Sequence, residues 1–155
     1  FCILKGSVKS QVSQGVILGN GVHSFIRYHL PAFFVGTVIL LLTSLPTLPQ
    51  PDIGLNWQDK VYHLAVYCVF GFALLRSFFY LFGKTLTTAL AVIPAGTLFG
   101  IMDEFHQLFI PGRQGHVYDM LADSAGVVLS VIVTLMLIRI REGKPIRRAR
   151  EEDLG

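Results

Sequence analysis

Charged residues are scarce in this chain, and their scarcity excludes an ordinary soluble domain. Asp, Glu, Lys and Arg make up only 15% of the 155 residues, whereas soluble domains carry about 25%. Hydrophobic residues reach 52%, and the mean hydropathy is +0.58. The apolar runs are longer than the roughly 10 to 14 residues typical of a buried helix in a soluble core. The sequence therefore predicts a membrane protein.

Cysteine is scarce as well, and several kinds of site are excluded with it. Cys2 and Cys68 have no metal-ligand spacing and form no convincing disulfide pair. No complete metal motif, nucleophile motif or internal repeat occurs.

The basic residues near the end of the chain are not interleaved with aromatic residues, so we expect contact with anionic lipid and no nucleic-acid partner.

Four apolar stretches are each close to the ~20 residues that a ~30 Å hydrocarbon layer requires. They are residues 28–45, 61–82, 86–109 and 117–138. The predicted fold is an all-α, polytopic four-helix transmembrane bundle that occupies residues 28–138. Residues 1–27 are predicted to be a cytoplasmic or interfacial segment with a turn at Gly19–Gly21, and residues 139–155 a basic cytoplasmic tail.

The distribution of basic residues predicts the orientation. Eleven of the 13 Lys and Arg residues fall on one side of the predicted spans, and only Lys60 and Arg113 fall on the other. The positive-inside rule then places both termini in the cytoplasm. It also places NWQDKVYH (56–63), DEFHQ (103–107) and VYDMLAD (117–123) together at the extracytoplasmic surface.

Helical spacing predicts which polar side chains face the interior of the bundle. Asp119 and Asp123 share a face with Ala122, Gly126, Ser130 and Thr134, the small-residue pattern that allows membrane helices to approach closely. Lys60 and His63 share a face with Tyr67 and Gly71, and Asp59 lies one turn before His63, where it can pair with it. Thr97, Gly100, Glu104 and Gln107 form a third such face.

The connection IPGRQGH (110–116) predicts a tight hairpin. Pro111 and Gly112 suit the two central positions of a type II turn, which needs a positive φ at the glycine. The turn would hold Arg113 just above the polar layer. Its planar guanidinium could bridge carboxylates from two helices.

The acidic residues allow two interpretations. Asp59, next to Asn56, and Asp119 stand at helix starts, where a carboxylate can simply cap the helix. Glu104 and Asp123 lie deeper, where an unpaired charge costs roughly 2.5 kcal/mol or more. With Asp103, these acids outnumber Lys60, Arg113 and any protonated His63 or His106. Shared protons or a bound divalent cation would resolve the surplus.

Three segments resemble the VanZ-like family of small bacterial membrane proteins. They are DKVYHLAVYCVFGFAL (59–74), GIMDEFHQLFIPGR (100–113) and the D-x3-D-x2-G run from Asp119 to Gly126. The resemblance covers about residues 30–138 and implies a four-helix protein of the bacterial cytoplasmic membrane. The family's namesake is linked to low-level resistance to teicoplanin, and no agreed biochemical activity comes with it. The last acidic position is often Asn in the family, so the charge of Asp123 is carried over less directly.

The matching residues define the expected site. The ligand-binding residues are expected to be Asp59, Lys60, His63, Glu104, Gln107, Arg113, Asp119 and Asp123, with Pro111 and Gly112 forming the turn. The first hypothesis is a protein that binds or modifies an envelope lipid or a glycopeptide-type ligand.

Two other functions stay open. In a membrane enzyme, Glu104 or Asp123 would be the general base and His63, oriented by Asp59, would relay the proton, while Arg113 would stabilise a developing anion. In a non-catalytic accessory subunit of a larger membrane complex, the polar layer would be a clasp that keeps the four helices in register.

Overall fold

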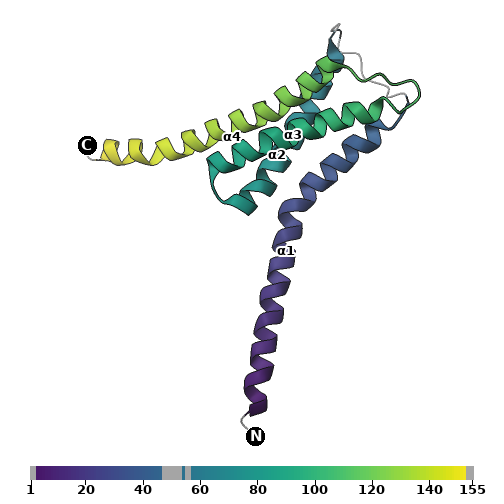
Figure 1. Cartoon of the computed structure of the whole chain (residues 1–155). Helices are drawn as coiled ribbons and strands as arrows, with labels where there is room; N and C mark the ends of the chain where they lie inside the picture. Colours follow the sequence, from purple (N-terminus) through teal and green to yellow (C-terminus); the bar gives the residue numbers. More distant parts are fainter. Residues whose placement is uncertain (1–2, 47–53, 55–56, 153–155) are drawn as a thin grey trace.

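The computed structural model of the chain consists of four α-helices (Figure 1). The described residues are 3–46, 54 and 57–152. The helices are α1 (Ile3–Thr43), α2 (Gln58–Phe82), α3 (Thr85–Gln107) and α4 (Val117–Glu152). Each contains a stretch long and apolar enough to cross a membrane. These stretches are Gly21–Thr43, Gln58–Phe82, Thr85–Gln107 and Val117–Ile140. The predicted all-α, four-span class is confirmed, whereas the orientation of the termini stays a prediction.

Two helices are longer than the sequence predicted. The turn expected at Gly19–Gly21 is wrong, because α1 continues through it without a break. A glycine inside a helix costs only about 1 kcal/mol relative to alanine, which is too little to end a long helix by itself. At the other end of the chain, α4 continues to Glu152 and includes most of the predicted tail. The limits predicted for the three segments therefore do not coincide with helix ends.

Tight turns join the last three helices. Gly83 ends α2 in the left-handed conformation, with φ of 63°, and its N–H donates to the Phe79 carbonyl at 2.8 Å. This is the usual glycine cap of a helix C-terminus. At the opposite end of the bundle, Gly112 has φ of 85° and the Arg113 N–H donates to the Ile110 carbonyl at 3.0 Å. The predicted Pro-Gly turn is thus confirmed.

Small residues allow α2 and α4 to pack closely. A Cβ atom added to Gly126 would collide with the Leu64 carbonyl oxygen and lie 2.9 Å from the Cys68 nitrogen, and one added to Gly71 would collide with Ser130. Val127, fully buried, fills the space beside Gly96 of α3. Close approach of backbones at small residues is the usual packing of membrane helices. The small-residue face predicted for α4 is confirmed.

The outside of the bundle is apolar. Phe33, Leu86 and Phe109 have exposed fractions of 74%, 71% and 70%. Such extensive exposure of large apolar side chains suits contact with lipid chains rather than water. In Figure 1, α2, α3 and the first part of α4 lie together, while the N-terminal part of α1 and the C-terminal part of α4 project away from them.

Candidate functional site

One end of the bundle gathers buried and half-buried polar side chains from all four helices. There the C-terminal ends of α1 and α3 meet the N-terminal ends of α2 and α4. We call the set the polar cluster. Its members are Thr43, Lys60, His63, Tyr67, Asp103, Glu104, Gln107, Asp119 and Asp123. Asp103, Glu104 and Asp123 have exposed fractions of 0%, 1% and 0%.

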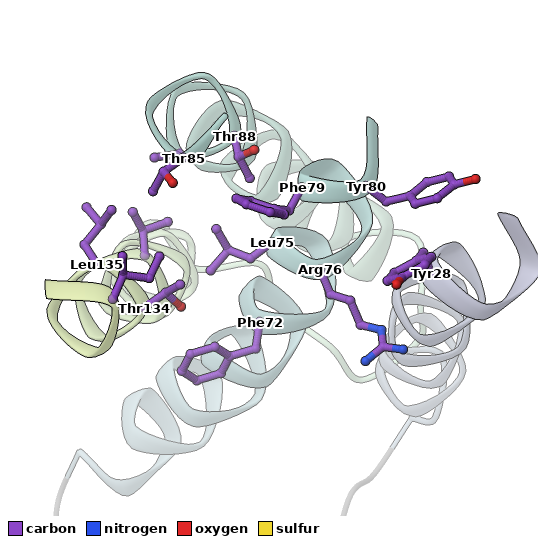
Figure 2. Close-up of a pocket in the computed structure, with 13 residues that line it drawn as sticks. Tyr28, Phe72, Leu75, Arg76, Phe79, Tyr80, Thr85, Thr88, Thr134 and Leu135 are labelled. Atoms are coloured by element: carbon purple, nitrogen blue, oxygen red, sulfur yellow. The ribbon is translucent and has the colours of Figure 1, made fainter. Parts of the chain in front are cut away.

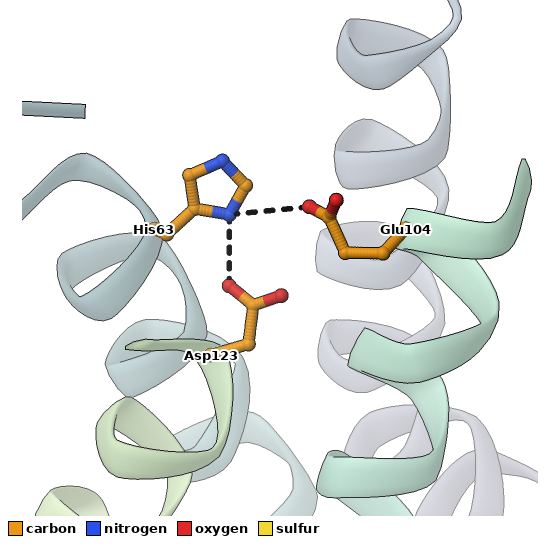
Figure 3. A group of neighbouring side chains, drawn as sticks. All are labelled: His63, Glu104 and Asp123. Carbon is orange, nitrogen blue, oxygen red and sulfur yellow. Dashed lines mark hydrogen bonds and ion pairs between the residues drawn. The ribbon is translucent and has the colours of Figure 1, made fainter. Parts of the chain in front are cut away.

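His63, Glu104 and Asp123 converge from three different helices (Figure 3). His63 Nδ1 lies 2.9 Å from Asp123 Oδ1 and 3.8 Å from Glu104 Oε1. Asp59 was predicted to orient His63, but the carboxylate against Nδ1 is that of Asp123. Helical spacing within one helix could not reveal this partner, because it is 60 positions away in the chain.

Glu104 is held in place by two donors. Gln107 Nε2 donates to Oε1 at 3.0 Å, and the backbone N–H of His116 donates to Oε2 at 3.0 Å. The first donor lies one turn further along α3, as the predicted face implied. The second comes from the loop before α4, so the hairpin contributes to the site through its backbone.

Asp103 is a central residue that the list of expected site residues omitted. It accepts hydrogen bonds from Thr43 Oγ1 at 2.7 Å, Tyr67 Oη at 3.2 Å and, more weakly, Gln107 Nε2 at 3.5 Å. These donors belong to α1, α2 and α3. The sequence held a signal for this role. A buried carboxylate such as Asp103, next to Glu104, is costly without a partner, and the Thr43 hydroxyl at the end of the first span could supply one.

Lys60 links two of the predicted acidic residues. Its Nζ lies 2.8 Å from Asp59 Oδ2 and is also paired with Asp119 Oδ1. The Asp119 side chain is 6% exposed and that of Asp59 is 42% exposed. Asp119 is therefore more than a helix cap, because its nearly buried carboxylate pairs with the partly exposed Lys60 and so joins α4 to α2. Asn56, the neighbour considered for a capping arrangement with Asp59, lies outside the described residues.

Arg113 contacts backbone carbonyls at the end of α1. Its Nε donates to the Leu45 oxygen at 2.9 Å and its Nη2 to the Leu42 oxygen at 3.3 Å. The expectation that its guanidinium bridges two carboxylates is wrong in this structure. The reason is geometric: the hairpin places the cation beside the Leu42 carbonyl in the last turn of α1 and the Leu45 carbonyl just after it, at the helix end that carries partial negative charge.

A small pocket opens beside the polar cluster between α1, α2 and α3. Its volume is about 100 Å³, and it is lined by Ile39, Leu42, Thr43, Tyr62, His63, Val66, Tyr67, Asp103 and Arg113. Aliphatic side chains and hydrogen-bonding groups thus line the same opening. A second cavity of about 610 Å³ lies toward the other end of the bundle, and none of the predicted site residues lines it. Figure 2 shows Arg76 of that cavity directed toward Tyr28, where the cation lies 5.2 Å from the ring centre.

Comparison with known proteins identifies the family of the chain. A family model described as VanZ/LLP1 matches residues 17–139, which is most of the chain. The chain belongs to the VanZ/LLP1 family. The predicted resemblance is confirmed, and the matched region contains the polar cluster, the Pro-Gly hairpin and the four spans except for the last residue of the fourth.

A VanZ/LLP1-family chain of this kind also has a eukaryotic relative. The protein is similar to "Uncharacterized protein C11E3.10" of Schizosaccharomyces pombe, with 28% identity over 125 residues, which is 78% of this chain and 72% of the yeast protein. No solved structure matches this chain. Bacterial origin, the particular membrane and a glycopeptide ligand stay predictions.

The structure brings most of the expected site residues together. Lys60, His63, Glu104, Gln107, Asp119 and Asp123 lie in the polar cluster, Asp59 lies at its edge, and Pro111, Gly112 and Arg113 form the adjoining hairpin. Their roles in binding or catalysis stay predictions. Thr43 and Tyr67, which were not among the expected ligands, join them through Asp103.

Proposed function

We propose that this VanZ/LLP1-family protein binds the headgroup of a membrane phospholipid at the polar cluster, and that the headgroup carries a primary ammonium beside its phosphate. The observation that carries the proposal is the pocket of about 100 Å³, which joins aliphatic side chains, three hydroxyl groups, Asp103 and Arg113 in one opening. The proposal includes the location of the polar cluster on the extracytoplasmic side of the membrane.

The size of the pocket favours a small polar group. Pockets for drug-sized ligands measure about 300–1,000 Å³, so an opening of about 100 Å³ admits only part of a molecule. A complete glycan-peptide headgroup would not enter it. The rest of an amphiphilic ligand would stay in the bilayer, against the aliphatic wall formed by Ile39, Leu42 and Val66.

The charges of the lining favour a zwitterionic headgroup. The Arg113 guanidinium is the group that suits a phosphate, because its planar donors match phosphate oxygens. Asp103 stands behind the hydroxyl groups of Thr43 and Tyr67, both of which donate to it. Its negative charge attracts an ammonium group that approaches these hydroxyl oxygens. A trimethylated ammonium has no N–H to donate and needs more room.

Lipid binding to the purified protein tests the proposal. We expect native mass spectrometry to detect one tightly bound phosphatidylethanolamine, and we expect binding at least tenfold weaker for phosphatidylcholine and phosphatidylglycerol. Arg113→Ala should weaken ethanolamine-lipid binding by about tenfold or more, since a hydrogen bond to a charged group contributes about 1.5–3 kcal/mol. Arg76→Ala removes an exposed arginine at the other end of α2 and should leave binding unchanged. Equal binding of the three lipids, or equal losses in the two variants, would overturn the proposal.

The accessory-subunit hypothesis is also supported by one observation. Hydrogen bonds and ion pairs of the polar cluster join all four helices, which is what an internal clasp would do. Copurification of this chain with another membrane protein at fixed stoichiometry, without any lipid preference, would favour this second function.

A further inference from the structure

We infer that His63, Glu104 and Asp123 form a binding site for one divalent transition-metal ion. Each residue offers one ligand atom, and the three atoms lie within 4.8 Å of one another. They come from α2, α3 and α4, so a bound ion would join three spans. This inference goes beyond lipid binding and does not depend on it.

The distances between the ligand atoms are close to those around a metal ion. His63 Nδ1 lies 2.9 Å from Asp123 Oδ1 and 3.8 Å from Glu104 Oε1. Bonds of about 2.0–2.2 Å to one ion separate neighbouring ligand atoms by about 3.0–3.5 Å. Small side-chain rotations would therefore bring the three atoms to coordination distance.

An unpartnered carboxylate oxygen is the second observation that points to a ligand. Asp123 is fully buried, and its Oδ2 has no hydrogen-bond partner among the described residues. Figure 3 shows this oxygen on the side that faces α3 and Glu104. A buried carboxylate oxygen without a partner is costly and needs an explanation. A cation bound between Asp123 and Glu104 supplies one.

The charge of the group also suits a divalent ion. Glu104 and Asp123 carry two negative charges when ionised, and both are almost completely buried within predicted membrane spans. A protonated His63 could offset only one of these charges. One divalent cation would balance both carboxylates, with a neutral imidazole as the third ligand.

The surroundings hold the ligands in position. Gln107 and the His116 backbone N–H donate to the two Glu104 oxygens, and such hydrogen bonds commonly orient metal ligands. On the α3 side, a Cβ atom added to Gly100 would lie 3.2 Å from Asp123 Oδ2. One imidazole nitrogen with two carboxylates favours Zn²⁺, Mn²⁺ or Fe²⁺, whereas Mg²⁺ and Ca²⁺ prefer oxygen ligands alone.

Metal analysis of the full-length protein in detergent tests the inference. After removal of metal with a chelator, Zn²⁺ or Mn²⁺ should bind at one ion per chain and raise the Tm, while Ca²⁺ and Mg²⁺ should bind at least tenfold more weakly. Asp123→Asn should weaken binding of the transition ion at least tenfold. His23→Ala, which removes an exposed imidazole at the end of the first span opposite the polar cluster, should bind it as the unmodified protein does.

The unmodified protein provides a readout that does not depend on whether a variant folds. Co²⁺ added to it should give visible absorption bands typical of a nitrogen and oxygen ligand set. Absence of both these bands and a Tm response to Zn²⁺ or Mn²⁺ would overturn the inference, as would equal binding by Asp123→Asn and His23→Ala. Because the measurements need no phospholipid, their failure is distinguishable from failure of the proposed lipid function.

Discussion

Gly126→Val will prevent α4 from packing against α2. The added side chain would begin at a Cβ that collides with the Leu64 carbonyl oxygen and lies 2.9 Å from the Cys68 nitrogen. Both atoms belong to the backbone of α2, so no side-chain rotation can relieve the overlap. Overpacking of a well-packed interior costs about 1–3 kcal/mol and occasionally more. We expect at least the upper end of that range.

The measurement is the fraction of folded protein after heating, followed by size-exclusion chromatography in detergent. Ala125→Val is the matched control, because Ala125 is the preceding residue of α4 and is exposed. It adds the same kind of bulk on the outer surface of the bundle and should leave the Tm nearly unchanged. A Gly126→Val protein as stable as Ala125→Val would contradict the close approach of α2 and α4.

Asp103→Leu will destabilise the protein by about 2–4 kcal/mol. The substitution removes the acceptor for Thr43 Oγ1 and Tyr67 Oη. A buried polar group left without its partner costs about 1–3 kcal/mol. Tyr67, which is 1% exposed, should account for most of the loss, because Thr43 also donates to the Ile39 carbonyl at 3.0 Å.

Two further variants separate the hydrogen bonds from the packing. Asp103→Asn keeps an acceptor oxygen and should cost less than Asp103→Leu. Tyr67→Phe removes the donor, so Asp103→Leu should be less harmful in the Tyr67→Phe protein than in the unmodified one. A double-mutant cycle of unfolding free energies measures this difference. Strictly additive effects would show that the two side chains do not act together.

Much of the fold follows from local patterns in the sequence. Length and apolarity predicted four spans, since a helix that crosses a bilayer must be about 20 residues long and largely uncharged. Helical spacing predicted that Asp123, Gly126 and Ser130 face the interior, and all three are buried. Pro111 and Gly112 predicted the hairpin, because few residues adopt the backbone angles of that turn. Each of these properties depends on residues close together in the chain.

The long-range partners were less predictable. Spacing within α2 suggested Asp59 for His63, whereas the neighbour on α4 is Asp123. Arg113 was expected to contact carboxylates, but the hairpin places it beside carbonyls at the end of α1. A turn was also predicted at Gly19–Gly21, but α1 continues through these residues, because two glycines weaken a helix without ending it.

By itself, the sequence determined that this is a four-span membrane protein of the VanZ type whose acidic residues lie near helix ends. Only the tertiary structure decided that Asp103 joins α1, α2 and α3, and that His63, Glu104 and Asp123 converge. The physical reason is that periodicity gives the face of a helix on which a residue lies. The rotation and depth of neighbouring helices, which are set by contacts such as Gly126 against Leu64, determine which faces meet.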